Sequence, residues 1–171
     1  SVSSTPVSTL RESPNGAVGY KFGSSVDEAR TTCGAAGQIL KSRSENVYLC
    51  NAVAPQFQLE GVVLIRTCSS GMVCQIDLVV SASYPTHNEW LKAYRSLSTT
   101  LHQRYGAAAT GTSPTDVSAC QGDFQVCLSD GRLRYSTTWK WPTGYAVQLA
   151  NGKTDGRIHI NYFDPEGVQS P

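Results

Sequence analysis

The chain has 171 residues, of which 40% are hydrophobic and 16% are charged, a size that suits one domain or two small fused modules. Its net charge is +1, and its fourteen Lys and Arg residues are scattered, which excludes the basic block expected of a nucleic-acid-binding surface. No segment reaches the roughly 18 apolar residues that a membrane-spanning helix needs.

The first residues, SVSSTPVSTLRESPNG, are rich in Ser, Thr and Pro and have neither the charged nor the apolar region of a signal peptide. We therefore interpret residues 1–18 as an extended arm or tether. Such a segment is typical of the chain after a processing site, or after the lipidated cysteine of a bacterial lipoprotein. A lipid anchor upstream of Ser1 is left open. A free tether is disordered, so an ordered arm would be held by its own domain or by a neighbouring molecule.

A first helix-plus-sheet module is predicted over residues 19–82. Ser25 is followed three residues later by Glu28, a capping box that predicts a short helix from Val26. Apolar and polar residues then alternate with the period of half-buried antiparallel strands. The predicted strands are GQILKS, NVYLCN, VVLIRTC and VCQIDLVVS, the last two forming a hairpin.

A second module is predicted over residues 83–171. Thr86 and Glu89 repeat the capping box, and a helical stripe follows that ends at Gly106. The stripe consists of Trp90, Tyr94, Leu97, Leu101 and Tyr105. The segment AAATGTSPTD reads as a loop, residues 117–127 are ambiguous, and RLRYSTTWKW, GYAVQLA and GRIHINYF read as strands.

These elements predict an α+β protein in which an antiparallel sheet, or two sheets, packs on two helices. The two halves follow a similar order, helix then antiparallel strands, and their capping boxes lie 61 residues apart, at Ser25 and Thr86. The chain therefore reads as two α-β-β-β modules in tandem, which together could form one compact domain.

Six cysteines fall into three neighbouring pairs. The pairs are Cys33/Cys50, Cys68/Cys74 and Cys120/Cys127. Their spacings differ from the close knuckles of zinc sites, and no His lies near either close pair, so we predict three disulfides by neighbour pairing. Disulfides indicate export to the periplasm, the outer-membrane surface or the outside. The alternative is six reduced, buried cysteines in the cytosol.

Four aromatic residues near the end of the chain form a candidate binding surface. Tyr135, Trp139 and Trp141 share one parity of their strand, and Tyr145 begins the same face of the next strand. One interpretation is that this face packs on the apolar stripe of the second helix. The other is that the aromatic residues are exposed and bind a partner.

No catalytic constellation is recognisable. His87, His102 and His159 are too far apart in the sequence to predict a shared site, and paired cysteines leave no free thiol nucleophile. The chain lacks a G-x-S-x-G turn, an H-E-x-x-H motif, a phosphate loop and a dinucleotide fingerprint. We expect no cofactor and no metal, and these absences favour a protein that is not an enzyme.

The stretch FGSSVDEA, residues 22–29, resembles the openings of certain bacterial envelope modules. These include the β-lactamase inhibitor proteins and the small outer-membrane assembly lipoproteins. The inhibitors carry two helix-plus-antiparallel-sheet modules and bind through a concave, aromatic-rich sheet face. The resemblance implies a similar tandem architecture here. The second half of the chain lacks the opening motif, and the cysteine pattern differs.

The leading hypothesis is an exported, non-enzymatic protein-binding or envelope-structural component. It would act through the aromatic face and the N-terminal arm, on a protein partner or on further copies of itself. The alternative is a small secreted hydrolase whose site the sequence does not reveal.

Overall fold

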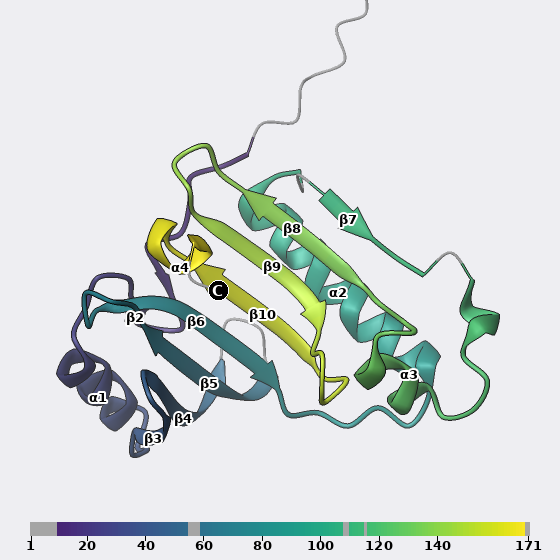
Figure 1. Ribbon diagram of the computed structural model, residues 1–171, viewed down its shortest axis with the longest axis horizontal. Coiled ribbons are helices and arrows are strands. Elements are labelled where there is room, and N and C mark those ends of the chain that lie inside the picture. Colours follow the sequence, from purple (N-terminus) through teal and green to yellow (C-terminus); the bar gives the residue numbers. More distant parts are fainter. Residues whose placement is uncertain (1–9, 55–58, 108–109, 115, 170–171) are drawn as a thin grey trace, which may run out of the picture.

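The computed structural model describes residues 10–54, 59–107, 110–114 and 116–169. It confirms the predicted α+β class: the described chain forms one eight-stranded antiparallel sheet with helices packed against it (Figure 1). The strand order is β3-β4-β5-β6-β10-β9-β8-β7. A separate short hairpin pairs β1 (Gly16–Ala17) with β2 (Tyr20–Lys21).

The sheet is built from two consecutive parts of the chain. The first part contains α1 (Val26–Ala35), β3 (Lys41–Ser44), β4 (Val47–Ala54), β5 (Leu59–Thr67) and β6 (Val73–Val80). The second contains α2 (His87–Tyr105), β7 (Thr110–Thr112), β8 (Ser136–Lys140), β9 (Ala146–Asn151) and β10 (Ile158–Phe163). The last strand of each part, β6 and β10, pair with one another at the centre. The two helix-plus-strand sets therefore share a single sheet.

Both predicted capping boxes begin helices. The hydroxyl of Ser25 accepts a hydrogen bond from the Glu28 backbone N–H at 3.2 Å, and the hydroxyl of Thr86 does the same for Glu89 at 3.2 Å. Each bond satisfies an amide that the first turn of a helix leaves without an internal partner. The predicted stripe of α2 is buried along its whole length, from Trp90 to Tyr105.

Four short elements are not among those that the sequence predicts. Strand β7 lies in a segment that is predicted to be a loop. Its sequence, Thr-Gly-Thr, has no apolar periodicity from which a strand could be predicted. The ambiguous segment forms a short 3₁₀ turn, Val117–Ala119, and the helix α3 (Phe124–Asp130). A last short helix, α4 (Pro165–Gln169), follows β10.

All three predicted disulfides are present. Cys33–Cys50 joins α1 to β4, Cys68–Cys74 closes the β5–β6 hairpin, and Cys120–Cys127 ties the 3₁₀ turn to α3. Three disulfides indicate an oxidising, exported environment. Among the described residues, no helix is long and apolar enough to cross a bilayer.

One face of the sheet is covered by α1 and α2, and we call it the covered face. In Figure 1, α2 passes behind β8 and β9, and the other face is turned to the viewer. The register places a row of buried side chains across the covered face. The row is Trp139, Val147, Tyr162, Ile76 and Ile65.

The described part of the predicted arm docks on its own domain. The Arg11 backbone N–H donates to the Tyr105 carbonyl at 2.9 Å, and the Arg11 carbonyl accepts from the Trp141 indole Nε1 at 2.6 Å. Leu10 packs against the core beside them. Residues 10–18 are therefore a strap on the covered side, whereas residues 1–9 lie outside the described residues.

Candidate functional site

The aromatic residues predicted as a binding surface lie mostly in the core. Trp139 is 0% exposed, Tyr135 5% and Trp141 7%. The Trp139 indole donates to the Gly106 carbonyl at 2.9 Å and lies beneath α2. Tyr145 is half-buried, with its ring centroid 5.9 Å from that of Phe22. This confirms the interpretation that the aromatic face packs on the apolar stripe of α2, and it rules out the exposed-face alternative for Tyr135, Trp139 and Trp141, whereas Tyr145 stays partly exposed.

The opposite face of the sheet carries no described helix, and we call it the open face. Its side chains are fixed by strand register, because directly paired residues of an antiparallel sheet point to the same side. Two rows run across it from the second half to the first. One row is Lys140, Ala146, Phe163, Gln75, Arg66 and Val47; the other is Thr138, Gln148, Asn161, Asp77, Leu64, Leu49 and Lys41.

The open face is unusually apolar in its first half. A solvated face of an antiparallel sheet normally presents polar side chains. Here five outward positions of β4, β5 and β6 are apolar and only partly or little exposed. They are Val47, Leu49, Val62, Leu64 and Val79. Strands with apolar residues on both faces are typical of sheets that are covered on both sides.

The open face is also hollowed near its centre. A depression of about 180 Å³ is lined by residues that include Val47, Leu64, Arg66, Gln75 and Asp77. Asp77 is only 9% exposed although it points away from the helices. The neighbouring side chains shield it on both sides, so the open face is a shallow basin rather than a flat plane.

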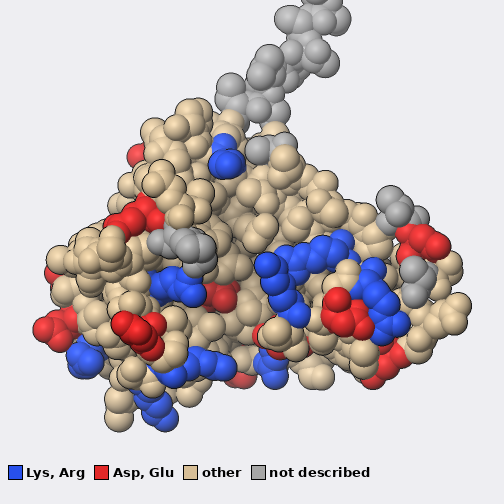
Figure 2. Space-filling model, in the orientation of Figure 1, with Lys and Arg blue, Asp and Glu red and all other residues tan. Residues whose placement is uncertain are grey.

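The open face carries positively charged side chains along both rows. Among the described residues, the side chains of Lys41, Arg66 and Lys140 have no ion-pair partner. In the orientation of Figure 1, Figure 2 shows Lys and Arg side chains over both halves of the face turned to the viewer. The carboxylates of Asp77 and Asp155 are bound by His159, and Glu60 lies at the start of β5.

His159 bridges two carboxylates at the centre of the open face. Its Nδ1 lies 2.9 Å from an Asp77 carboxylate oxygen, and its Nε2 lies 3.0 Å from an oxygen of Asp155. Burial alone would lower the pKa of His159, but the hydrogen bonds and negative charges of the two aspartates outweigh it. The pKa is therefore raised above 6.5, which favours an imidazolium that donates to both partners.

This arrangement is poorly suited to acid–base catalysis. A general base needs a ring nitrogen within reach of the proton it removes, and both nitrogens of His159 face carboxylates. The other histidines are each engaged through one ring nitrogen: His87 Nε2 lies 3.1 Å from the Tyr135 hydroxyl, and His102 Nδ1 lies 2.7 Å from the Ser98 carbonyl and 3.3 Å from the Ser98 hydroxyl. Among the described residues, no group of His, Cys, Asp and Glu is arranged to hold a metal ion.

Besides the aromatic residues, the sequence contains a pattern that predicts an apolar open face. The run VVLI in β5 and the run LVV in β6 are apolar at both parities. Such continuity indicates a strand that is buried on both faces.

No family model, no curated protein and no solved structure matches the chain. The geometry of the open face is therefore the basis for a proposed function.

Proposed function

We propose that the protein is an exported, non-enzymatic binding component whose open sheet face receives a protein partner. The observation that carries the proposal is the pair of strands β5 and β6, which are apolar on both sides yet covered on one side in the described chain. Partly exposed apolar side chains such as Leu64 and Val62 lose contact with water when a partner covers them. Interfaces combine such an apolar centre with a polar rim.

The charges favour an acidic partner. Among the described residues, Lys41, Arg66 and Lys140 form no ion pair, and the central aspartates are already bound by His159. Complementary charge steers association and selects among partners. Two open faces would bring like charges together, so pairing of two copies through this face is disfavoured. Self-assembly, if it occurs, would use a different surface.

Because the three disulfides indicate an exported environment, we infer that the partner is met in an exported compartment. We place the encounter in the periplasm, at the outer-membrane surface or outside the cell. The tandem order of helix and strands is the order that the resemblance of residues 22–29 implies, but most of the aromatic face that it implies is buried. The hydrolase alternative receives no support from His159, because both of its ring nitrogens face carboxylates.

The experiment is capture of partners from native exported fractions on immobilised protein. Arg66→Glu/Lys140→Glu reverses two charges of the open face, and Lys92→Glu is the matched control, because Lys92 lies exposed on α2. We expect wild type and Lys92→Glu to retain the same acidic protein, and the double variant to lose it. The captured amount should also fall as salt concentration rises.

Two checks keep the result interpretable. Surface substitutions usually change the free energy of unfolding by no more than about 0.5 kcal/mol, so urea unfolding should show that the double variant is folded. Arg66→Gln/Lys140→Gln removes the charges without adding repulsion and should weaken capture to an intermediate degree. A partner bound equally by wild type and both open-face variants would refute the proposed surface.

A further inference from the structure

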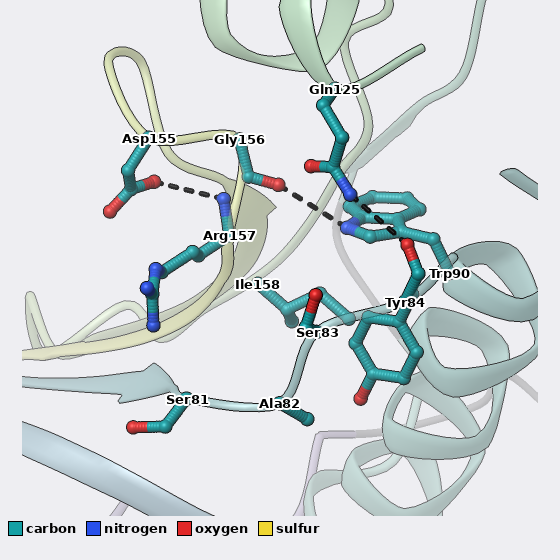
Figure 3. A pocket seen from close by; sticks show the side chains of 10 residues that line it. All are labelled: Ser81, Ala82, Ser83, Tyr84, Trp90, Gln125, Asp155, Gly156, Arg157 and Ile158. Carbon is teal, nitrogen blue, oxygen red and sulfur yellow. Dashed lines mark hydrogen bonds between the residues drawn. The ribbon is translucent and has the colours of Figure 1, made fainter. Parts of the chain in front are cut away.

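A second concave site lies at the end of the sheet where β6 leaves and β10 begins. Its volume is about 250 Å³. Three segments that are distant in the sequence line it: the β6–α2 connection, the β9–β10 turn and α3 (Figure 3). The lining residues are Ser81, Ala82, Ser83, Tyr84, Trp90, Gln125, Asp155, Gly156, Arg157 and Ile158.

Hydrogen bonds between these segments hold the pocket in shape. The Trp90 indole donates to the Gly156 carbonyl at 3.3 Å, and the Gln125 side-chain amide donates to the Tyr84 carbonyl at 3.2 Å. Gly156 has a φ of +65°, and a Cβ there would lie 3.0 Å from the Ser129 hydroxyl of α3. The close approach of α3 to this turn therefore depends on glycine. A pocket formed in advance does not spend binding energy on ordering its walls.

Some polar side chains that line the pocket make no hydrogen bond or ion pair with the described residues. Among the described residues, the guanidinium of Arg157 and the hydroxyls of Ser81 and Ser83 have no hydrogen-bond or ion-pair partner. The bonds of Arg157 are made by its backbone alone: its N–H donates to Asp155 at 2.9 Å, and its carbonyl accepts from Gly152 at 2.8 Å. The guanidinium is therefore free to bind another group.

The unused groups and the apolar groups lie on different sides of the pocket. In Figure 3 the Arg157 side chain extends on the side of Ser81, while Tyr84 and Trp90 lie on the other side, with Ile158 between them. The Asp155 carboxylate is engaged by the Arg157 backbone and by His159, which offsets its charge. A ligand that spans the pocket would meet donors at one end and apolar surface at the other.

We propose that this pocket binds a small monocarboxylic acid with a flat apolar body. The guanidinium presents paired N–H donors whose spacing matches a carboxylate, and Ser81 adds a hydroxyl donor beside it. The apolar body lies against Tyr84 and Ala82, since Trp90 and Ile158 are each only 1% exposed. At about 30 Å³ per water, the pocket has space for on the order of eight water-sized groups, which suits an acid of the size of benzoate.

Titration of the purified protein with sodium benzoate, followed by ¹H–¹⁵N NMR, tests the proposal. The indole N–H of Trp90 reports directly on the pocket through its bond to Gly156. We expect saturable shifts of that resonance and of the amides of residues 81–84 and 155–158, with a Kd on the order of 1 mM for so small a ligand. Benzamide, which has the same shape without the charge, should bind at least tenfold more weakly.

Arg157→Gln should weaken benzoate binding at least tenfold. Arg43→Gln removes another exposed guanidinium that has no ion-pair partner among the described residues, on the edge strand β3, and should leave the affinity unchanged. Equal affinity of wild type and Arg157→Gln, shifts that do not saturate, or shifts centred outside the pocket would each overturn the proposal. The titration involves no protein partner, so its outcome is independent of whether the open face binds one.

Discussion

The two faces of the sheet differ more than their sequences suggest. Successive residues of one strand supply both, yet the covered face gathers the large aromatic side chains, whereas the open face gathers aliphatic side chains and unpaired cations. Ile65 and Leu64 are neighbours in β5: Ile65 is 1% exposed beneath the helices, and Leu64 is half-buried on the open side.

The difference shows that an aromatic cluster by itself does not identify a binding surface. Trp139 and Trp141 satisfy their indole N–H groups with carbonyls of the same chain, Gly106 and Arg11. Their polar atoms are therefore used within the fold. On the open face, Arg66 and Lys140 have no such partners among the described residues. Unused polar groups beside partly exposed apolar ones are the better guide to an interface.

The largest effect is expected from the covered face. Trp139→Ala removes a fully buried ring and its hydrogen bond, and should lower the free energy of unfolding by about 3–5 kcal/mol. Urea unfolding of the oxidised protein measures this change. Lys140→Ala, one residue away but exposed, should change it by less than about 0.5 kcal/mol. A Trp139→Ala protein as stable as wild type would place this ring outside the core.

Substitutions in β5 should change the free energy of unfolding by an intermediate amount, and by different amounts on the two faces of the strand. Ile65→Ala should lower the free energy of unfolding by about 2–5 kcal/mol, because the substitution leaves a cavity in the core. Leu64→Ala should cost on the order of 1 kcal/mol, since the smaller side chain leaves space that water can enter. The same unfolding measurement compares them. Equal costs would mean that the open face is packed as tightly as the core, and the distinction between the faces would fail.

The smallest stability effect concerns His159 and depends on pH. Its pKa in the folded protein is raised above 6.5 because the carboxylates of Asp77 and Asp155 outweigh the opposing effect of burial. A raised pKa contributes stability that is fully present below the unfolded pKa and is lost as pH rises through the folded pKa. The stability advantage of wild type over His159→Gln should therefore shrink as the pH is raised from mildly acidic to mildly alkaline.

Urea midpoints of wild type and His159→Gln across that pH range measure the effect. The control is His102→Gln, because His102 lies exposed on α2 and bonds a carbonyl of its own helix. His102→Gln removes a histidine that bonds neither Asp77 nor Asp155, so it controls for the exchange of histidine for glutamine itself. An advantage over His159→Gln that grows with pH would contradict the charge arrangement described for the open face.

The sequence predicted the elements that depend on local pattern. Capping boxes located both long helices, alternation located most strands, and cysteine spacing located three disulfides. It missed β7, which has three exposed residues, and α4, which is too short for a periodic pattern. The pairing of β6 with β10 joins residues more than eighty positions apart, such as Asp77 and Asn161, and local pattern carries no information about it.

The candidate site was harder to predict than the fold. His159, Asp77 and Asp155 come together only because β6 and β10 pair and the β9–β10 turn folds back over them. The spacing of these three residues in the sequence does not predict that their side chains lie close together. The apolar runs of β5 and β6 did carry a signal, since they contain apolar residues at both parities. The tryptophans drew the choice of candidate binding residues to the covered face, because large aromatic residues mark cores and interfaces alike.

The most direct test of the open face is amide hydrogen exchange of the protein, alone and bound to the acidic partner obtained by capture. Our account predicts slower exchange in β4, β5, β6 and β10, where backbone amides lie beneath the open face, and unchanged exchange in α2. Protection confined to α2, or to the strap of residues 10–18, with the strands unchanged, would contradict the account and move the binding surface to the helical side.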